Sequence, residues 1–126
     1  DMGLKIITGS DSSWGDYQLG NTVYETECLV RAGLSPMAGI LSVTSQAAKS
    51  IAIDGVTGTL ETQKEADLII VDGNPAQDIS VLWNIDEVFL AGERIDRGPG
   101  SFISKIRQDP PASRPEAKIT AFATAR

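Results

Sequence analysis

The fold is decided by the stretch Ala66-Asp67-Leu68-Ile69-Ile70-Val71-Asp72, which the turn residues Gly73-Asn74-Pro75 end. A short apolar run of β-branched residues between turn signals is typical of a strand that is buried on both faces. Further along the chain, Glu87–Leu90 and Glu93–Ile95 flank Ala91-Gly92, which is a hairpin pattern. The residues between these strands, 76–83, are expected to form a helical turn. Residues 66–95 therefore predict a small sheet.

Upstream of this sheet the sequence favours helices. Asn21 or Thr22 is a candidate cap for a helix that runs to about Ala32 and ends at Gly33. Ser35-Pro36 has the form of an N-cap followed by proline at the first helical position. An apolar stripe at helical spacing follows, made of Met37, Ile40, Leu41, Thr44, Ala47, Ala48 and Ile51. Because Leu4–Thr8 is also a strand pattern, we expect an α+β unit with two helices and four or five strands.

Composition excludes several classes of function. The chain has 126 residues, enough for one small domain, and it contains no histidine. Histidine-ligated metal sites, Ser-His-Asp triads and imidazole acid–base catalysis are therefore excluded, unless another chain supplies the ring. No uninterrupted apolar run exceeds four residues, whereas a membrane-spanning helix needs about 20. We therefore expect no contact with a membrane.

Charge and cysteine content add further limits. Residues 1–97 carry 6 Lys/Arg against 15 Asp/Glu, whereas residues 98–126 carry 5 against 2. An acidic body repels phosphate backbones, so nucleic-acid binding is not expected. One cysteine, Cys28, excludes an intramolecular disulfide, and this fits a reducing compartment. A cytoplasmic location is the expectation.

Most polar and aromatic residues have a structural interpretation. Glu25 and Glu27 stand two residues apart on a predicted helix and so point in different directions, which argues against an acid–base pair. Cys28 has no histidine to activate it, so a buried, inert thiol is expected. For Trp14 and Trp83 we expect a place in the core rather than in a cleft. Three aspartates border strands and turns and are expected to cap backbone groups or to face solvent rather than to bind an ion: Asp54, Asp67 and Asp72.

The order of these motifs resembles the C-terminal segment of the metal-dependent amidohydrolase superfamily, nearest to its imidazolonepropionase-like and prolidase-like branch. The residues that carry the resemblance are Ile6–Ser12, Ala32–Met37, Thr44–Ala48, Gly58–Glu61, Lys64–Pro75 and Val88–Ile95. The resemblance implies the last strand and helices of a TIM-like barrel (1–55), a β-rich return segment of the small domain (56–97) and a flexible Pro/Ser-containing tail (98–126). In the tail, Phe102, Ile103 and Ile106 have the spacing to dock as one helical turn. A barrel fragment of this kind is expected to rearrange or oligomerise when isolated.

By this resemblance, Asp11 is the candidate catalytic and metal-binding residue. The family's aspartate at the end of the eighth barrel strand binds a zinc-like divalent ion and takes a proton from the metal-bound water. The alternative is that Asp11 is a turn residue within Gly-Ser-Asp-Ser. The family's other ligands, histidines and a bridging lysine or glutamate, lie on strands that this chain lacks, since a whole barrel takes about 250 residues. Asp11 is therefore expected to bind metal only with ligands from another chain and to be vestigial otherwise, so the chain alone carries no cofactor.

Two functions remain open at the level of sequence. The first is an amidohydrolase-like fragment, whose class chemistry is metal-dependent hydrolysis of C–N bonds in non-peptide or dipeptide amides, inactive alone. The second is a non-enzymatic, stand-alone oligomeric binding or structural module derived from such a fragment. Under either hypothesis the isolated chain has exposed apolar surface and exposed sheet edges. We therefore expect either a homo-oligomer, most simply a dimer, or a complex with a complementing barrel polypeptide.

Overall fold

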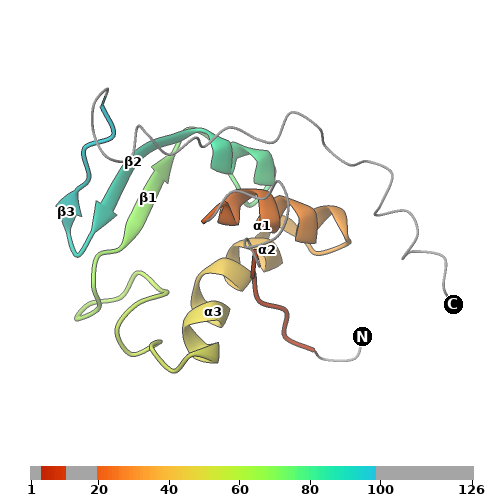
Figure 1. The fold of residues 1–126 in the computed structure, drawn as a ribbon, viewed down its shortest axis with the longest axis horizontal. Coiled ribbons are helices and arrows are strands. Elements are labelled where there is room, and N and C mark those ends of the chain that lie inside the picture. The colour runs from red at the N-terminus through yellow and green to blue at the C-terminus, as the bar shows by residue number, and fades with distance from the viewer. Residues whose placement is uncertain (1–3, 11–19, 99–126) are drawn as a thin grey trace, which may run out of the picture.

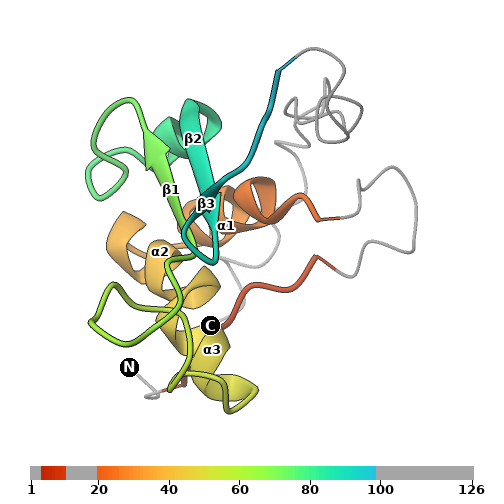
Figure 2. The ribbon, with the colours of Figure 1, turned by 90° about the vertical axis from the view of Figure 1, so that its left-hand side faces the viewer.

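The structure, a computed structural model, describes residues 4–10 and 20–98. It has helices packed beside a small antiparallel sheet (Figures 1 and 2), so the α+β class is confirmed. The described elements are α1 (Thr22–Arg31), α2 (Pro36–Val43), α3 (Ser45–Ser50), β1 (Leu68–Val71), the 3-10 helix η1 (Ile79–Trp83), β2 (Ile85–Leu90) and β3 (Glu93–Arg94). Within these residues the prediction of two helices and four or five strands is wrong, since three α-helices and three strands are present. No described helix has the length and apolar character needed to cross a bilayer.

Both predicted helix starts are confirmed, because capping is a local property. The Asn21 side chain accepts a hydrogen bond from the Tyr24 amide at 3.3 Å, and Ser35 Oγ accepts one from the Ala38 amide at 3.2 Å. Each cap satisfies a backbone N–H that the first turn of a helix leaves without a partner. The predicted stop after α1 is also present, where Gly33 has a φ of +118°. That backbone conformation favours glycine.

The single helix predicted after Ser35 is wrong, because the chain breaks at Thr44 into α2 and α3. Thr44 has φ −119° and ψ −101°, which is not helical. Its hydroxyl donates a hydrogen bond to the Ile40 carbonyl at 2.7 Å, a local bond that competes with regular helix geometry. The apolar stripe is divided as a result. Ala48 is buried, whereas Ile51 at the end of α3 is 66% exposed.

The strand predicted at Leu4–Thr8 is also wrong. The segment runs alongside α2 instead, where the Thr8 amide donates to the Ser42 carbonyl at 3.1 Å, and Leu4 is 73% exposed. A strand exists only where a neighbouring strand completes its hydrogen bonds. Among the described residues none lies beside this segment, so its β-branched composition has no ladder to enter.

The sheet has the order β1-β2-β3, with Leu68 opposite Phe89 and Ile69 opposite Val88. The predicted hairpin and the helical turn before it are both confirmed, as β2–β3 and η1. The prediction that β1 is buried on both faces is wrong, because Ile69 and Ile70 are each 45% exposed. The described elements do not cover both faces of β1, and Ile69 lines an open groove.

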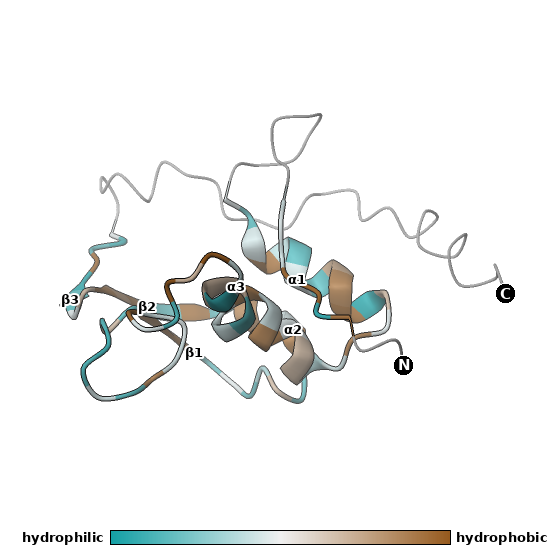
Figure 3. Ribbon diagram, turned by 90° about the horizontal axis from the view of Figure 1, so that it is seen from below, coloured by the Kyte–Doolittle hydropathy of each residue, from teal (hydrophilic) through white to brown (hydrophobic). Residues whose placement is uncertain are grey.

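The core is small and lies at the contacts of α1 with α2 and η1 and of α2 with α3. Its buried apolar residues are Tyr24, Ala48, Ile79 and Leu82, and its buried polar residues are Thr26, Glu27 and Ser42. Apolar residues occur in the helices and along the sheet (Figure 3), and several of them are exposed, such as Met37 on α2 and Leu90 on β2. Much of the hydrophobic surface therefore faces outward instead of meeting another element of the described chain.

Candidate functional site

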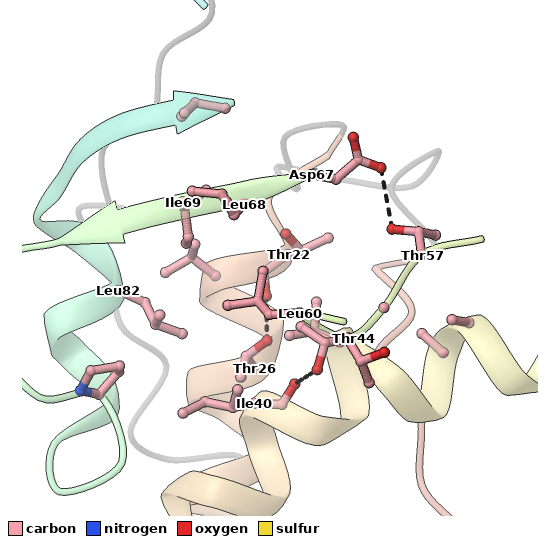
Figure 4. Close-up of a pocket in the computed structure, with 18 of the residues that line it drawn as sticks. Thr22, Thr26, Ile40, Thr44, Thr57, Leu60, Asp67, Leu68, Ile69 and Leu82 are labelled. Atoms are coloured by element: carbon pink, nitrogen blue, oxygen red, sulfur yellow. Dashed lines mark hydrogen bonds between the residues drawn. The ribbon is translucent and has the colours of Figure 1, made fainter. Parts of the chain in front are cut away.

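An apolar groove of about 730 Å³ lies between the helices and the sheet (Figure 4). Its walls come from α1, α2 and α3 on one side and from β1, β2 and η1 on the other, with the loop after α3 along its rim. Residues whose side chains or backbone line it include Val23, Thr26, Ile40, Ala47, Ile51, Leu60, Leu68, Ile69, Leu82 and Phe89. An apolar cavity of this size is within the range of ligand-binding sites.

Two of the threonine hydroxyls at the groove are bonded to nearby backbone. Thr26 Oγ1 donates to the Thr22 carbonyl at 2.7 Å, and Thr44 Oγ1 donates to the Ile40 carbonyl at 2.7 Å. Figure 4 shows both bonds. Each of these two hydroxyls donates its proton to a backbone carbonyl four residues earlier, and most of the other lining residues are apolar. The described lining therefore suits an apolar occupant.

Among the described residues that line the groove Asp67 is the one ionisable residue, and both of its carboxylate oxygens have partners. Oδ2 accepts from Thr57 Oγ1 at 3.2 Å (Figure 4), and Oδ1 accepts from the Ala91 amide at 2.8 Å. The carboxylate joins the rim loop to the turn between β2 and β3. The predicted capping role is confirmed for Asp67.

The rim loop after α3 is held by a second polar cluster. Lys64 Nζ donates to Thr59 Oγ1 at 2.6 Å and lies 3.5 Å from Glu61 Oε1. The pKa of Glu61 is held below its ordinary value, first by a hydrogen bond with the Thr59 side chain and then by the Lys64 charge. These bonds fix the shape of the loop whose apolar residues border the groove.

Asp11, the predicted metal-binding residue, lies outside the described residues, and so does Trp14. The chain that leads to Asp11 is described as far as Ser10. It is attached to α2 through Thr8 Oγ1 and Ser42 Oγ, which are 2.8 Å apart. Ser42 Oγ donates its single proton to the Gly39 carbonyl at 2.7 Å, so Thr8 is the donor between the two hydroxyls.

The residues that the structure describes do not fit a metal ion. Across 4–10 and 20–98, no group of three or more His, Cys, Asp or Glu side chains is placed to hold one, and three protein ligands is the usual number in a catalytic zinc site. Glu27 accepts a hydrogen bond from Trp83 Nε1 at 3.0 Å. Burial raises the pKa of the neighbouring Glu25 carboxyl.

Cys28 is partly rather than fully buried, which corrects the prediction of a buried thiol. Burial nevertheless raises its pKa and is the largest influence on it, so the unreactive thiol form is favoured. Trp83, predicted in the core, is also only partly buried and joins α1 to η1 through Glu27. No sequence signal links Glu27 to a partner 56 residues away, and none identifies the groove, whose lining comes from six elements.

The sequence of the chain matches a protein family and individual proteins of known name. The model of the amidohydrolase family matches residues 1–95. Ochratoxinase of Aspergillus niger is 32% identical over 102 residues, which is 78% of this chain and 20% of the ochratoxinase. Adenine deaminase 2 of Jannaschia sp. (strain CCS1) is 30% identical over 84 residues, which is 66% of this chain and 14% of the deaminase. The chain thus spans a fifth or less of the length of these relatives.

Solved structures agree with the sequence comparison. A Xaa-Pro dipeptidase crystallised with methionine in its active site matches with a TM-score of 0.67 and 38% identity, over 75% of this chain and 23% of the dipeptidase. Molinate hydrolase matches with a TM-score of 0.60 and 28% identity, over 64% of this chain and 17% of the hydrolase. The family model covers more than half of the chain, and the chain belongs to the amidohydrolase family.

Proposed function

We propose that this chain is the C-terminal part of a metal-dependent amidohydrolase that cleaves C–N bonds in dipeptide or non-peptide amides. The observation that carries the proposal is the family match over residues 1–95. The names of similar proteins, ochratoxinase and Xaa-Pro dipeptidase, support hydrolysis as the class of reaction. The coverage of a fifth to a quarter of these proteins supports a contribution to an active site rather than a whole one.

In this proposal Asp11 supplies one carboxylate to a divalent-metal site, and the other ligands come from polypeptide outside these 126 residues. The sequence contains no histidine, and the described residues hold no metal-binding cluster. The chain is therefore inactive alone. Residues 1–55 take the place of the last barrel strand with its helices, residues 56–97 belong to the small β-domain, and residues 98–126 are the tail.

The exposed elements support a complementing polypeptide as the partner. Leu4–Thr8 has strand composition without a ladder, and β1 has a free edge among the described residues. Strands of a complementing barrel chain would complete the hydrogen bonds of both. A homodimer is the alternative partner. The single cysteine, Cys28, supports a reducing, cytoplasmic setting for either assembly.

The test compares zinc retention by two proteins. The first is this chain; the second is a chimaera in which the chain replaces the matching C-terminal portion of the Xaa-Pro dipeptidase. After dialysis with and then without zinc, elemental mass spectrometry is expected to find no retained zinc in the chain alone and retained zinc in the chimaera. The chimaera is also expected to hydrolyse a Xaa-Pro dipeptide.

A matched pair of variants isolates the proposed ligand. In the chimaera, Asp11→Asn is expected to lower zinc content and hydrolysis by at least about tenfold, because an amide is a weaker ligand than a carboxylate. Asp16→Asn, in the same stretch of sequence, is the control and is expected to change neither. One zinc ion held firmly by the chain alone would contradict the proposal, as would equal behaviour of the two variants. Either result would favour the non-enzymatic module.

A further inference from the structure

The apolar groove is open, and its rim carries large hydrophobic side chains. Leu60 is 80% exposed and Ile51 66% exposed, and both line the groove. Figure 4 shows Leu60 between the helical wall and β1, beside Ile40 and Thr26. Exposed apolar surface that is continuous with a cavity marks a site of interaction. The question is which polypeptide covers it.

We propose that the groove binds residues 101–107 of the same chain. This segment lies outside the described residues and reads Ser101-Phe102-Ile103-Ser104-Lys105-Ile106-Arg107. Its three large apolar side chains stand at i, i+1 and i+4, the spacing that gathers them on one side of a helical turn. Lys105 and Arg107 flank the apolar set and remain available for contacts at the rim.

Charge complementarity favours this occupant. Residues 99–126 carry 5 Lys/Arg against 2 Asp/Glu, whereas the described residues carry 6 against 12. The rim loop, residues 52–67, carries four acidic side chains: Asp54, Glu61, Glu65 and Asp67. Its single basic residue, Lys64, is already engaged with Glu61. An acidic loop beside an apolar groove, with Asp67 in the groove lining itself, matches a segment with apolar residues and flanking basic ones.

The described part of the chain ends close enough to the groove for the residues that follow to reach it. Arg97 Nη1 donates to the Ile85 carbonyl at 2.7 Å, and Ile85 is paired with Val71, which lines the groove. Adjacent strands are about 4.8 Å apart. The five residues from Arg97 to Phe102 can span about 17 Å when extended. Tethering at this distance also gives the segment a high effective concentration at the groove.

Disulfide trapping in the full chain tests the proposal. In a Cys28→Ser background, Ile106→Cys is combined with Leu60→Cys at the rim of the groove or, as the control, with Leu90→Cys on β2. Both leucines are exposed, 80% and 58%, so neither change should disturb folding. The control pair is closer in sequence, so random collision favours it. We expect the Leu60 pair to form the intramolecular disulfide at least about fivefold faster under mild oxidation at low salt.

Salt and charge variants add a second readout. The advantage of the Leu60 pair is expected to shrink in 1 M NaCl and with Glu65→Lys, because both weaken attraction between rim and segment. Equal rates for the two pairs would overturn the proposal. Predominant disulfides between chains, seen by gel electrophoresis, would also overturn it, since they would identify a second copy as the occupant.

Discussion

Gly58 is the position where a single added methyl group should have the largest effect on stability. It has a φ of +94°, and a Cβ built there would lie 2.6 Å from the Ala48 Cβ and 3.3 Å from both Ser45 Cα and the Thr44 carbonyl oxygen. A left-handed backbone costs a residue with a Cβ about 1–2 kcal/mol. Crowding a packed contact adds about 1–3 kcal/mol. Gly58→Ala should therefore lower the free energy of unfolding by about 2–5 kcal/mol.

Two other glycines separate these contributions. Gly33 has a φ of +118° with no atom within 4 Å of a built Cβ, so Gly33→Ala should show only the backbone cost of about 1–2 kcal/mol. Gly55 has neither a positive φ nor an atom within 4 Å of a built Cβ. The free energy of unfolding of Gly55→Ala should therefore stay within about 0.5 kcal/mol of that of the parent chain. Urea unfolding followed by far-UV circular dichroism measures all three. If Gly58→Ala cost no more than Gly33→Ala, the packing of the rim loop on α3 would be refuted.

Three further predictions follow from individual contacts. Trp83→Phe removes the hydrogen bond to the buried Glu27 carboxylate. Urea unfolding should show that the free energy of unfolding falls by about 1.5–3 kcal/mol, and a fall of less than about 0.5 kcal/mol would contradict the contact. Burial raises the pKa of Cys28, so alkylation by iodoacetamide at pH 8 should be several-fold slower in the folded chain than in 8 M urea; equal rates would contradict this. The pKa of Asp78 is lowered, first by the Ser80 hydroxyl and then by the Ser80 amide. A lowered carboxyl pKa stabilises the fold at pH values above the ordinary pKa of 3.8. This stabilisation is lost as the pH falls through the lowered pKa. The deficit in stability of Asp78→Ala at pH 7 should therefore shrink towards pH 2, and a deficit independent of pH would refute the assignment.

Sequence predicts the parts of this fold that depend on neighbours along the chain. The caps Asn21 and Ser35 act on amides three residues away. The β2–β3 turn needs only Ala91 and Gly92, which have φ values of +50° and +80°. Each of these features is encoded within a few residues, so the sequence alone predicts it.

The wrong predictions concern features that depend on distant partners. Leu4–Thr8 has the composition of a strand, yet a strand also requires a neighbour, and composition does not reveal whether one exists. The apolar run Leu68–Val71 was predicted to be buried, but burial depends on what covers it. The break at Thr44 carries neither glycine nor proline to mark it. The groove likewise combines six elements, and Asp11 lies outside the described residues.

The two bonds of Asp67 have a consequence for local opening of the molecule. One carboxylate ties the rim loop at Thr57 to the strand turn at Ala91, segments 34 residues apart in sequence. Because the same Asp67 carboxylate holds both segments, a movement that breaks its bond to one segment also disturbs its bond to the other. Amide hydrogens in both segments should therefore exchange with solvent at matched rates, as one cooperative unit. The rim of the groove and the end of the sheet would open and close together.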